Sequence, residues 1–241
     1  MTHAAAAAHS AHDDTHGHPP TSTGLDNKKI AIWAFIGSEC MLFASLISTY
    51  LIYKGRSVVG PFPHEWWCST TKTIGFCAGE NAEHVVNSMK PILNIPVTSA
   101  STFVLLMSSL FMVLALAAVQ NKEKPKRTRG ERILGNSKLW LWMTAIAGTT
   151  FLGFQAFEFT SVVHEGLTIR TNLFGSSFFT LTGFHGAHVT AGVLWLLTLL
   201  AIDYRRGLGP KDAINVDLAA LYWHFVDVVW IAIFTLIYLI K

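Results

Sequence analysis

Charged residues are scarce in this sequence. Asp, Glu, Lys and Arg make up only 14% of its 241 residues, whereas ordinary soluble domains carry about 25%. Hydrophobic residues make up 51%. So small a charged fraction argues against an ordinary water-exposed surface and indicates that lipid is the solvent for much of the chain.

Long polar segments are missing from five stretches of the sequence. These apolar runs cover approximately 30–53, 95–120, 138–163, 173–202 and 216–240. Each run exceeds the roughly 20 residues that a helix needs to cross a hydrocarbon core, and none shows the polar face that a soluble amphipathic helix carries. The sequence therefore predicts an all-α, polytopic membrane protein, a bundle of five transmembrane helices.

Internal repeats and mid-span prolines are also lacking. The one proline that touches a run is Pro96, at the start of the second run. Secondary transporters often contain repeats or broken helices. A small proton-coupled transporter that uses Glu39 and Asp227 is therefore a more distant alternative.

Basic residues are unevenly distributed between the runs. One side holds twelve of the 18: Lys28, Lys29, the seven in 121–138, Arg205, Arg206 and Lys211. The positive-inside rule places this side in the cytoplasm. We therefore expect a plasma-membrane protein with a cytoplasmic N-terminus and an external C-terminus. Nucleic acid is not an expected partner, because the basic loop is short and has no interleaved aromatic residues.

Two segments lie outside the spans. Residues 1–27 are rich in Ala and His and are predicted to be a disordered cytoplasmic tail, followed by a membrane domain over 28–241. Residues 54–94 form a long loop that the charge rule places outside. This loop contains Cys68 and Cys77, whose spacing matches no common zinc site. An oxidising compartment permits a disulfide between them, and two free thiols are the alternative.

Several polar side chains interrupt the apolar runs, where ionisable groups are costly and usually have a partner or a function. Glu39 lies near the middle of the first run, and no basic residue follows on its helix before Lys54. The others form pairs three residues apart, hence on one helical face: Gln155 with Glu158, His185 with His188, and His224 with Asp227. We interpret these pairs as an interhelical polar network and Glu39 as the carboxylate most directly related to function.

A haem or metal site has little support. His185 and His188 lie on one helix and cannot both bind the same iron, although His188 and His224 could in principle. The chain has no C-x-x-C-H haem attachment motif and no His, Cys and Met cluster typical of copper. We predict no metal site, and a haem-bearing membrane cytochrome stays a distant alternative.

Several motifs together resemble one known family. These are "PVTSASTFVLLMSSL", "FQAFEF", "GFHGAHVTAG", "YWHFVDVVW" and the helix that contains Glu39. They are similar to subunit III of the haem–copper terminal oxidases, in its five-helix bacterial form. The similarity extends from about residue 30 to the C-terminus.

The resemblance implies an accessory role in an aerobic respiratory oxidase that reduces oxygen to water and translocates protons. Subunit III carries no cofactor and is not catalytic alone, since haem and copper lie in partner subunits. It supports proton uptake by the catalytic subunit, its stability and its lipid binding. Glu39 matches the family's intramembrane carboxylate, and Arg205 and Arg206 are candidate lipid head-group contacts by location.

The same resemblance suggests the partners. They are catalytic subunit I, subunit II and membrane phospholipids, and the 54–94 loop is a candidate contact for cytochrome c or another respiratory complex. Cytochrome c is the expected electron donor of the complex. Subunit III of a quinol oxidase is the nearest alternative, because the donor site lies on other chains.

Overall fold

Five long helices dominate the computed structural model, which describes residues 26–54, 56, 67–68, 89–90, 93–122 and 128–240. They are α1 (Asn27–Tyr53), α3 (Ile95–Gln120), α5 (Ser137–His164), α6 (Leu173–Arg205) and α7 (Ala213–Phe234). The shorter elements are α4 (Arg129–Leu134), the 3₁₀ turn η1 (Pro210–Asp212) and the π-helical turn η2 (Thr235–Leu239). Two-residue strands β1 (Trp67–Cys68) and β2 (Met89–Lys90) pair antiparallel. Each predicted apolar run lies within one long helix or, for the last, in α7 and η2.

Short polar side chains fix where the helices begin. Asp26 caps α1, and asparagines cap the next three long helices: Asn94, Asn136 and Asn172. In each case the side-chain oxygen accepts a hydrogen bond from a backbone N–H of the first turn, a group that has no partner within the helix. The helices therefore start where an apolar run meets a capping residue.

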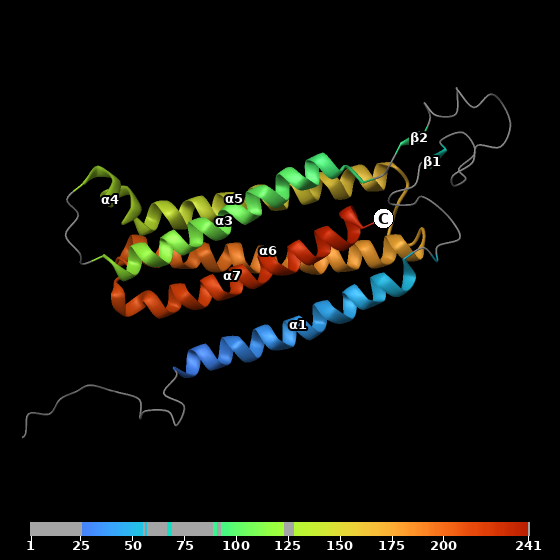
Figure 1. The fold of residues 1–241 in the computed structure, drawn as a ribbon. Helices are drawn as coiled ribbons and strands as arrows, with labels where there is room; N and C mark the ends of the chain where they lie inside the picture. Colours follow the sequence, from blue (N-terminus) through green and yellow to red (C-terminus); the bar gives the residue numbers. More distant parts are fainter. Residues whose placement is uncertain are drawn as a thin grey trace, which may run out of the picture.

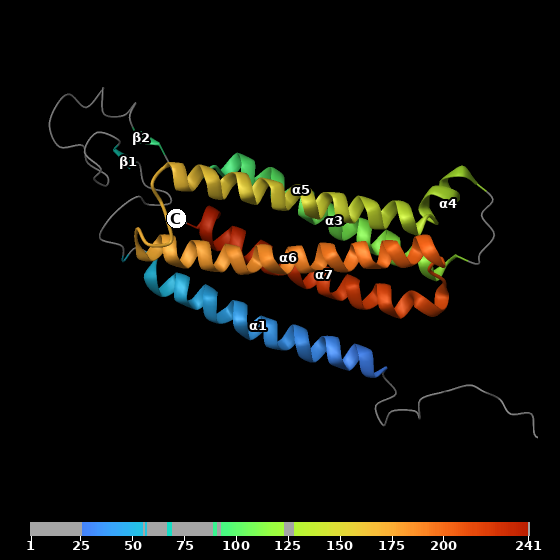
Figure 2. The same ribbon diagram turned by 180° about the vertical axis from the view of Figure 1, so that it is seen from behind.

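The long helices run side by side in layers. Helices α6 and α7 lie in the middle, with α1 on one side and α3 and α5 on the other (Figures 1 and 2). One end of the bundle holds α4, η1 and the start of α1. The opposite end holds β1, β2 and the end of η2 (Figure 1). The described basic residues at the start of α1, on α4 and at the end of α6 therefore lie at the same end.

Four segments are long and apolar enough to cross a membrane: α1, α3, α6, and α7 with its flanking turns. Helix α5 is not among them, because its Thr and Gly residues, Gln155 and Glu158 lower its mean hydropathy. The prediction of an all-α membrane protein is confirmed. That α5 also crosses the membrane, as a fifth transmembrane helix, is proposed below.

Two predictions lie largely outside the described residues. Of the proposed tail, residues 1–25 are not described, and Asn27 already begins α1. Most of the 54–94 loop is likewise outside, including Cys77, and only the backbone of Cys68 is described. The disulfide therefore stays a prediction.

Three hydrogen bonds join α7 to α3. The indole N–H groups of Trp223 and Trp230 donate to Ser108 Oγ and Thr102 Oγ1, both at 2.9 Å. Ser109 Oγ donates to Asp227 Oδ2 at 2.7 Å. Since lipid is as apolar as the helix surfaces, such polar contacts and close packing hold membrane helices together.

Two glycines make room for the Trp223 indole. A Cβ atom on Gly148 of α5 would lie 2.5 Å from Trp223 Cη2, and one on Gly192 of α6 would lie 2.8 Å from Trp223 Cε3. Real side chains do not approach so closely. The buried indole therefore requires glycine on both neighbouring helices, which lets α5, α6 and α7 pack tightly.

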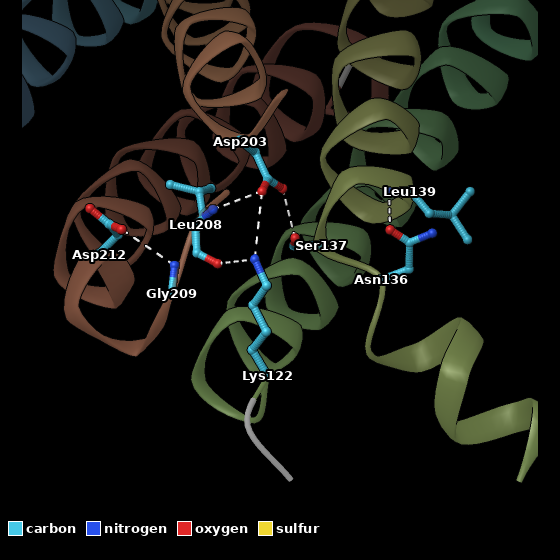
Figure 3. Close-up of polar contacts among 8 residues, drawn as sticks. All are labelled: Lys122, Asn136, Ser137, Leu139, Asp203, Leu208, Gly209 and Asp212. Carbon is cyan, nitrogen blue, oxygen red and sulfur yellow. Dashed lines mark hydrogen bonds and ion pairs between the residues drawn. The ribbon is translucent and has the colours of Figure 1, made fainter. Parts of the chain in front are cut away.

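Asp203 joins four segments at the end of the bundle that holds α4 (Figure 3). Its side chain is buried at the end of α6, where Oδ2 accepts from Ser137 Oγ at 2.7 Å and Oδ1 from Leu208 N at 2.8 Å. Lys122 Nζ lies 3.9 Å from Oδ1 and donates to the Leu208 carbonyl. One carboxylate thus connects α5, α6, the turn into α7 and the lysine that follows α3.

Replacing Asp203 by Ala should destabilise the bundle markedly. Buried donors left without an acceptor cost about 1–3 kcal/mol each, so we expect a loss of about 3 kcal/mol of unfolding free energy. The matched control is Asp217→Ala, which removes the partly exposed Lys29–Asp217 ion pair (2.7 Å) and should cost less than about 1 kcal/mol. Thermal unfolding followed by tryptophan emission would measure both, and equal losses would contradict this role of Asp203.

Gly148→Ala should also destabilise the protein, by about 1–3 kcal/mol, because the new methyl group overlaps the indole. Gly153 lies further along α5, and a Cβ atom added there would meet nothing within 4 Å. Gly153→Ala should therefore be neutral or stabilising by up to about 1 kcal/mol. The same unfolding measurement compares the two variants, and an equal effect would show that Trp223 does not require Gly148.

Candidate functional site

Glu39 and His188 form a hydrogen-bonded pair between α1 and α6. His188 Nε2 lies 3.0 Å from Glu39 Oε2. The Glu39 side chain is 16% exposed and the His188 side chain 15%. Glu39 is about 18 Å along α1 from Asn27, at about 1.5 Å per residue, and so lies near the middle of the helix. Glu39 thus has a basic partner, which is on another helix rather than on its own.

The hydrogen bond at His188 Nδ1 determines how many protons the Glu39–His188 pair carries. His188 Nδ1 lies 2.7 Å from the Phe184 carbonyl oxygen. A carbonyl only accepts hydrogen bonds, so Nδ1 must carry a proton. Nε2 and Oε2 therefore share one further proton, which makes the pair either two neutral groups or an ion pair. Moving that proton between the two atoms requires no change in side-chain position.

Aromatic side chains support His188 from α1 and α7. The Phe43 ring meets the imidazole edge-on, with centroids 5.0 Å apart. Tyr222 Oη donates to the His188 backbone carbonyl at 2.9 Å. These contacts fix the position and orientation of the ring, which is the requirement for a defined proton-sharing geometry.

Gln155 and Glu158 lie on the buried face of α5 but bind different partners. Gln155 Nε2 donates to the Thr182 carbonyl of α6 at 2.6 Å. Glu158 Oε1 accepts from Thr98 Oγ1 of α3 and from Tyr238 Oη of η2, both at 2.9 Å. Both residues connect helices, although not to each other.

His185 lies apart from His188, in the centre of the bundle. It is fully buried, stacks on Trp230 at a centroid distance of 4.8 Å, and meets the Phe151 ring edge-on. Within the described part of the chain, neither ring nitrogen has a hydrogen-bond partner. The structure therefore places the two histidines of one motif in different environments.

His224 and Asp227 also face different neighbours. Asp227 turns inward to Ser109 of α3, as described above, whereas His224 is half-buried in a groove between α1 and α7. Asp227 is near enough to interact electrostatically with His224. The predicted network is thus a set of separate interhelical contacts.

The two candidate lipid-contact arginines lie at the end of α6, and both are exposed. Arg206 Nη2 lies 2.9 Å from Asp212 Oδ1 of η1, and the arginine borders a small pocket of about 180 Å³. Among the described residues, no three His, Cys, Asp or Glu side chains are grouped to hold a metal ion.

Comparison with known proteins assigns the family. The sequence profile of the family "Cytochrome c oxidase subunit III" matches residues 12–241. The chain belongs to this family. It is therefore a membrane subunit of a haem–copper oxidase complex and associates with other subunits of that complex.

Relatives of two kinds are similar to this subunit III chain. Cytochrome c oxidase subunit 3 of Bacillus sp. (strain PS3) is 37% identical, over 88% of this chain and 86% of the relative. Cytochrome bo(3) ubiquinol oxidase subunit 3 of Pseudomonas aeruginosa is 32% identical, over 95% of this chain and 92% of the relative. Quinol oxidase subunit 3 of Bacillus subtilis (strain 168) is 32% identical, over 87% of this chain and 85% of the relative.

Several residues of this subunit III chain are not predicted by the sequence patterns. Tyr222, Thr98, Tyr238 and Ser109 each donate to a polar group or backbone within the spans. Asp203 stands beside Tyr204 and two arginines, a pattern typical of an exposed helix end, and so gives no sign of its burial. For Thr98 and Ser109, the available signal in the sequence is that each is a polar residue within an apolar run, where it needs a partner on another helix.

Proposed function

We propose that this chain is the accessory, cofactor-free subunit III of a proton-translocating cytochrome c oxidase, and that the Glu39–His188 pair supports proton uptake by the catalytic subunit. The observation that carries the proposal is the pair itself. A carboxyl and an imidazole share one proton across 3.0 Å, at mid-helix depth where an unpaired ionisable group would be costly.

The pair is suited to hold a proton rather than to react with oxygen. Its atoms are fixed by Phe184, Phe43 and Tyr222, while its two side chains keep limited exposure at the surface between α1 and α6. In this proposal, haem and copper in partner subunits perform the redox chemistry. The buried polar residues Gln155, Glu158, His185 and Asp227 act in helix packing.

Five transmembrane helices are part of the proposal. Helix α5 has 28 residues, which at about 1.5 Å each is enough to cross a hydrocarbon core of about 30 Å. It lies beside α3 and α6, and its polar residues Gln155 and Glu158 bind groups on other helices. Because these polar groups have partners inside the bundle, α5 can cross the membrane despite its lower mean hydropathy.

Cytochrome c is the proposed electron donor because the 37% identical relative is a cytochrome c oxidase subunit. The relatives at 32% identity that are named quinol oxidase subunits make the quinol oxidase the second candidate. Oxygen consumption by the purified complex, supplied with either reduced cytochrome c or a quinol, distinguishes the two.

We further propose contacts with catalytic subunit I, subunit II and phospholipids. Arg205 and Arg206 are the candidate lipid contacts, supported by their exposure at the basic end of the bundle. The 54–94 loop is the candidate contact for cytochrome c or another respiratory complex.

Glu39→Gln should lower turnover without changing the haem spectra, because glutamine cannot share the proton. We expect less than about a tenfold loss, since removing a group that transfers a proton in the chemical step typically costs about 10²–10⁴-fold. Oxygen consumption and proton uptake by the purified complex provide the measurement.

The matched control is Glu158→Gln. Glu158 is also a buried carboxyl, but its partners are hydroxyl groups instead of a histidine. It should leave turnover unchanged once the complex is assembled. His188→Asn should resemble Glu39→Gln, and the double variant should be no worse than either, because the two residues act as a unit. Additive losses, or equal effects of Glu39→Gln and Glu158→Gln, would argue against the proposal.

The proposed orientation puts α4 in the cytoplasm and the α5–α6 connection outside, in the plasma membrane. In a cysteine-free background, Gly130→Cys on α4 should react with a membrane-impermeant thiol reagent only from the cytoplasmic side. Ile169→Cys, an exposed position at the other end, should react only from outside in intact cells. The reverse pattern would invert the orientation.

A further inference from the structure

A groove between α1 and α7 opens on the outer surface of the bundle. This open groove has a volume of about 450 Å³ and is lined by Trp33, Ile36 and Gly37 of α1 and by Leu221, His224, Phe225 and Val228 of α7. Its volume falls in the range typical of small-molecule sites, which are mostly apolar with a few polar groups. The Trp33 indole N–H and the imidazole of His224 are the polar side-chain groups among the lining residues.

The depth of His224 limits what can occupy the groove. It stands about 16 Å along α7 from Ala213, at about 1.5 Å per residue, and so lies near mid-membrane. Phospholipid head groups do not reach this depth, and an acyl chain offers the imidazole no hydrogen bond. Within the described part of the chain, no side chain or backbone group forms a hydrogen bond with the His224 ring. A polar group facing hydrocarbon without a partner is unfavourable.

We propose that this groove binds a membrane-soluble quinone. A quinone has a flat head with oxygen atoms that accept hydrogen bonds, and an apolar tail. The His224 ring N–H would donate to a head oxygen, since a neutral imidazole has one donor and one acceptor nitrogen. The aromatic walls, Trp33 and Phe225, suit a planar ring.

Asp227 supports this assignment from inside the bundle. It lies close to one turn beyond His224, interacts with it electrostatically, and its Oδ1 has no hydrogen-bond partner among the described residues. Because no hydrogen bond joins the two side chains, the carboxylate does not take up the imidazole N–H, which can face the groove. The proposal concerns binding alone and does not depend on the role proposed for Glu39.

Photolabelling of the intact oxidase complex in liposomes tests the site. A short-tailed azidoquinone should label the segments 33–37 and 221–228, and an excess of unlabelled decylubiquinone should remove the label. His224→Leu should weaken the apparent affinity by about three- to tenfold, as expected for the loss of one hydrogen bond.

Gly37→Leu offers a second variant, which fills the groove. A Cβ at Gly37 meets nothing within 4 Å, and Gly37 lines the groove, so the leucine side chain should occupy the groove and abolish labelling. Gly153→Leu on α5 is the matched control, because a Cβ there also meets nothing within 4 Å and α5 contributes no residue to the groove lining. Haem spectra and subunit content confirm that each variant assembles.

Three results would overturn the proposal. Labelling that is equal in Gly37→Leu and Gly153→Leu would show that the groove is not the site. Labelling spread evenly over lipid-facing positions such as Phe103 would indicate partition into the bilayer. Absence of label from both segments, because a helix of another subunit covers the groove, would identify a protein contact instead.

Discussion

The absence of water around the helices is the constraint on which this structure depends. In lipid, burying one apolar side chain against another gains little, so helices associate through close packing and interhelical hydrogen bonds. The bundle has both. Trp223 occupies a space that glycines on two neighbouring helices create, and its indole donates to a serine on a third. Buried carboxylates then connect several helices at each end, Asp203 at one and Glu158 at the other.

Much of the fold could be predicted from the sequence, because membrane thickness sets the length of an apolar run. All five predicted runs coincide with long helices, and the capping Asp and Asn residues mark the starts of four of them. The packing of glycines could not be predicted. Gly148 and Gly153 look alike in sequence, yet one lies against an indole and the other faces open space.

The site was harder to predict than the fold. Glu39 stood out as an intramembrane carboxylate, but its partner is 149 positions away, and only the three-dimensional arrangement of α1 and α6 joins them. Helical spacing put His185 and His188 near one face, yet a difference of three residues sends one ring to the centre and the other toward α1. The π-helical turn that brings Tyr238 to Glu158 has no readable sequence signal.

In the proposed pair, Glu39 Oε2 and His188 Nε2 share one proton. Infrared spectroscopy of the complex tests this most directly, because a carboxyl band reports its hydrogen-bond partner. The band that Glu39→Gln removes should shift when His188 is replaced by Asn, and again when the protein is labelled with ¹⁵N-histidine. A Glu39 band that neither change affects would mean that the two residues do not share a proton.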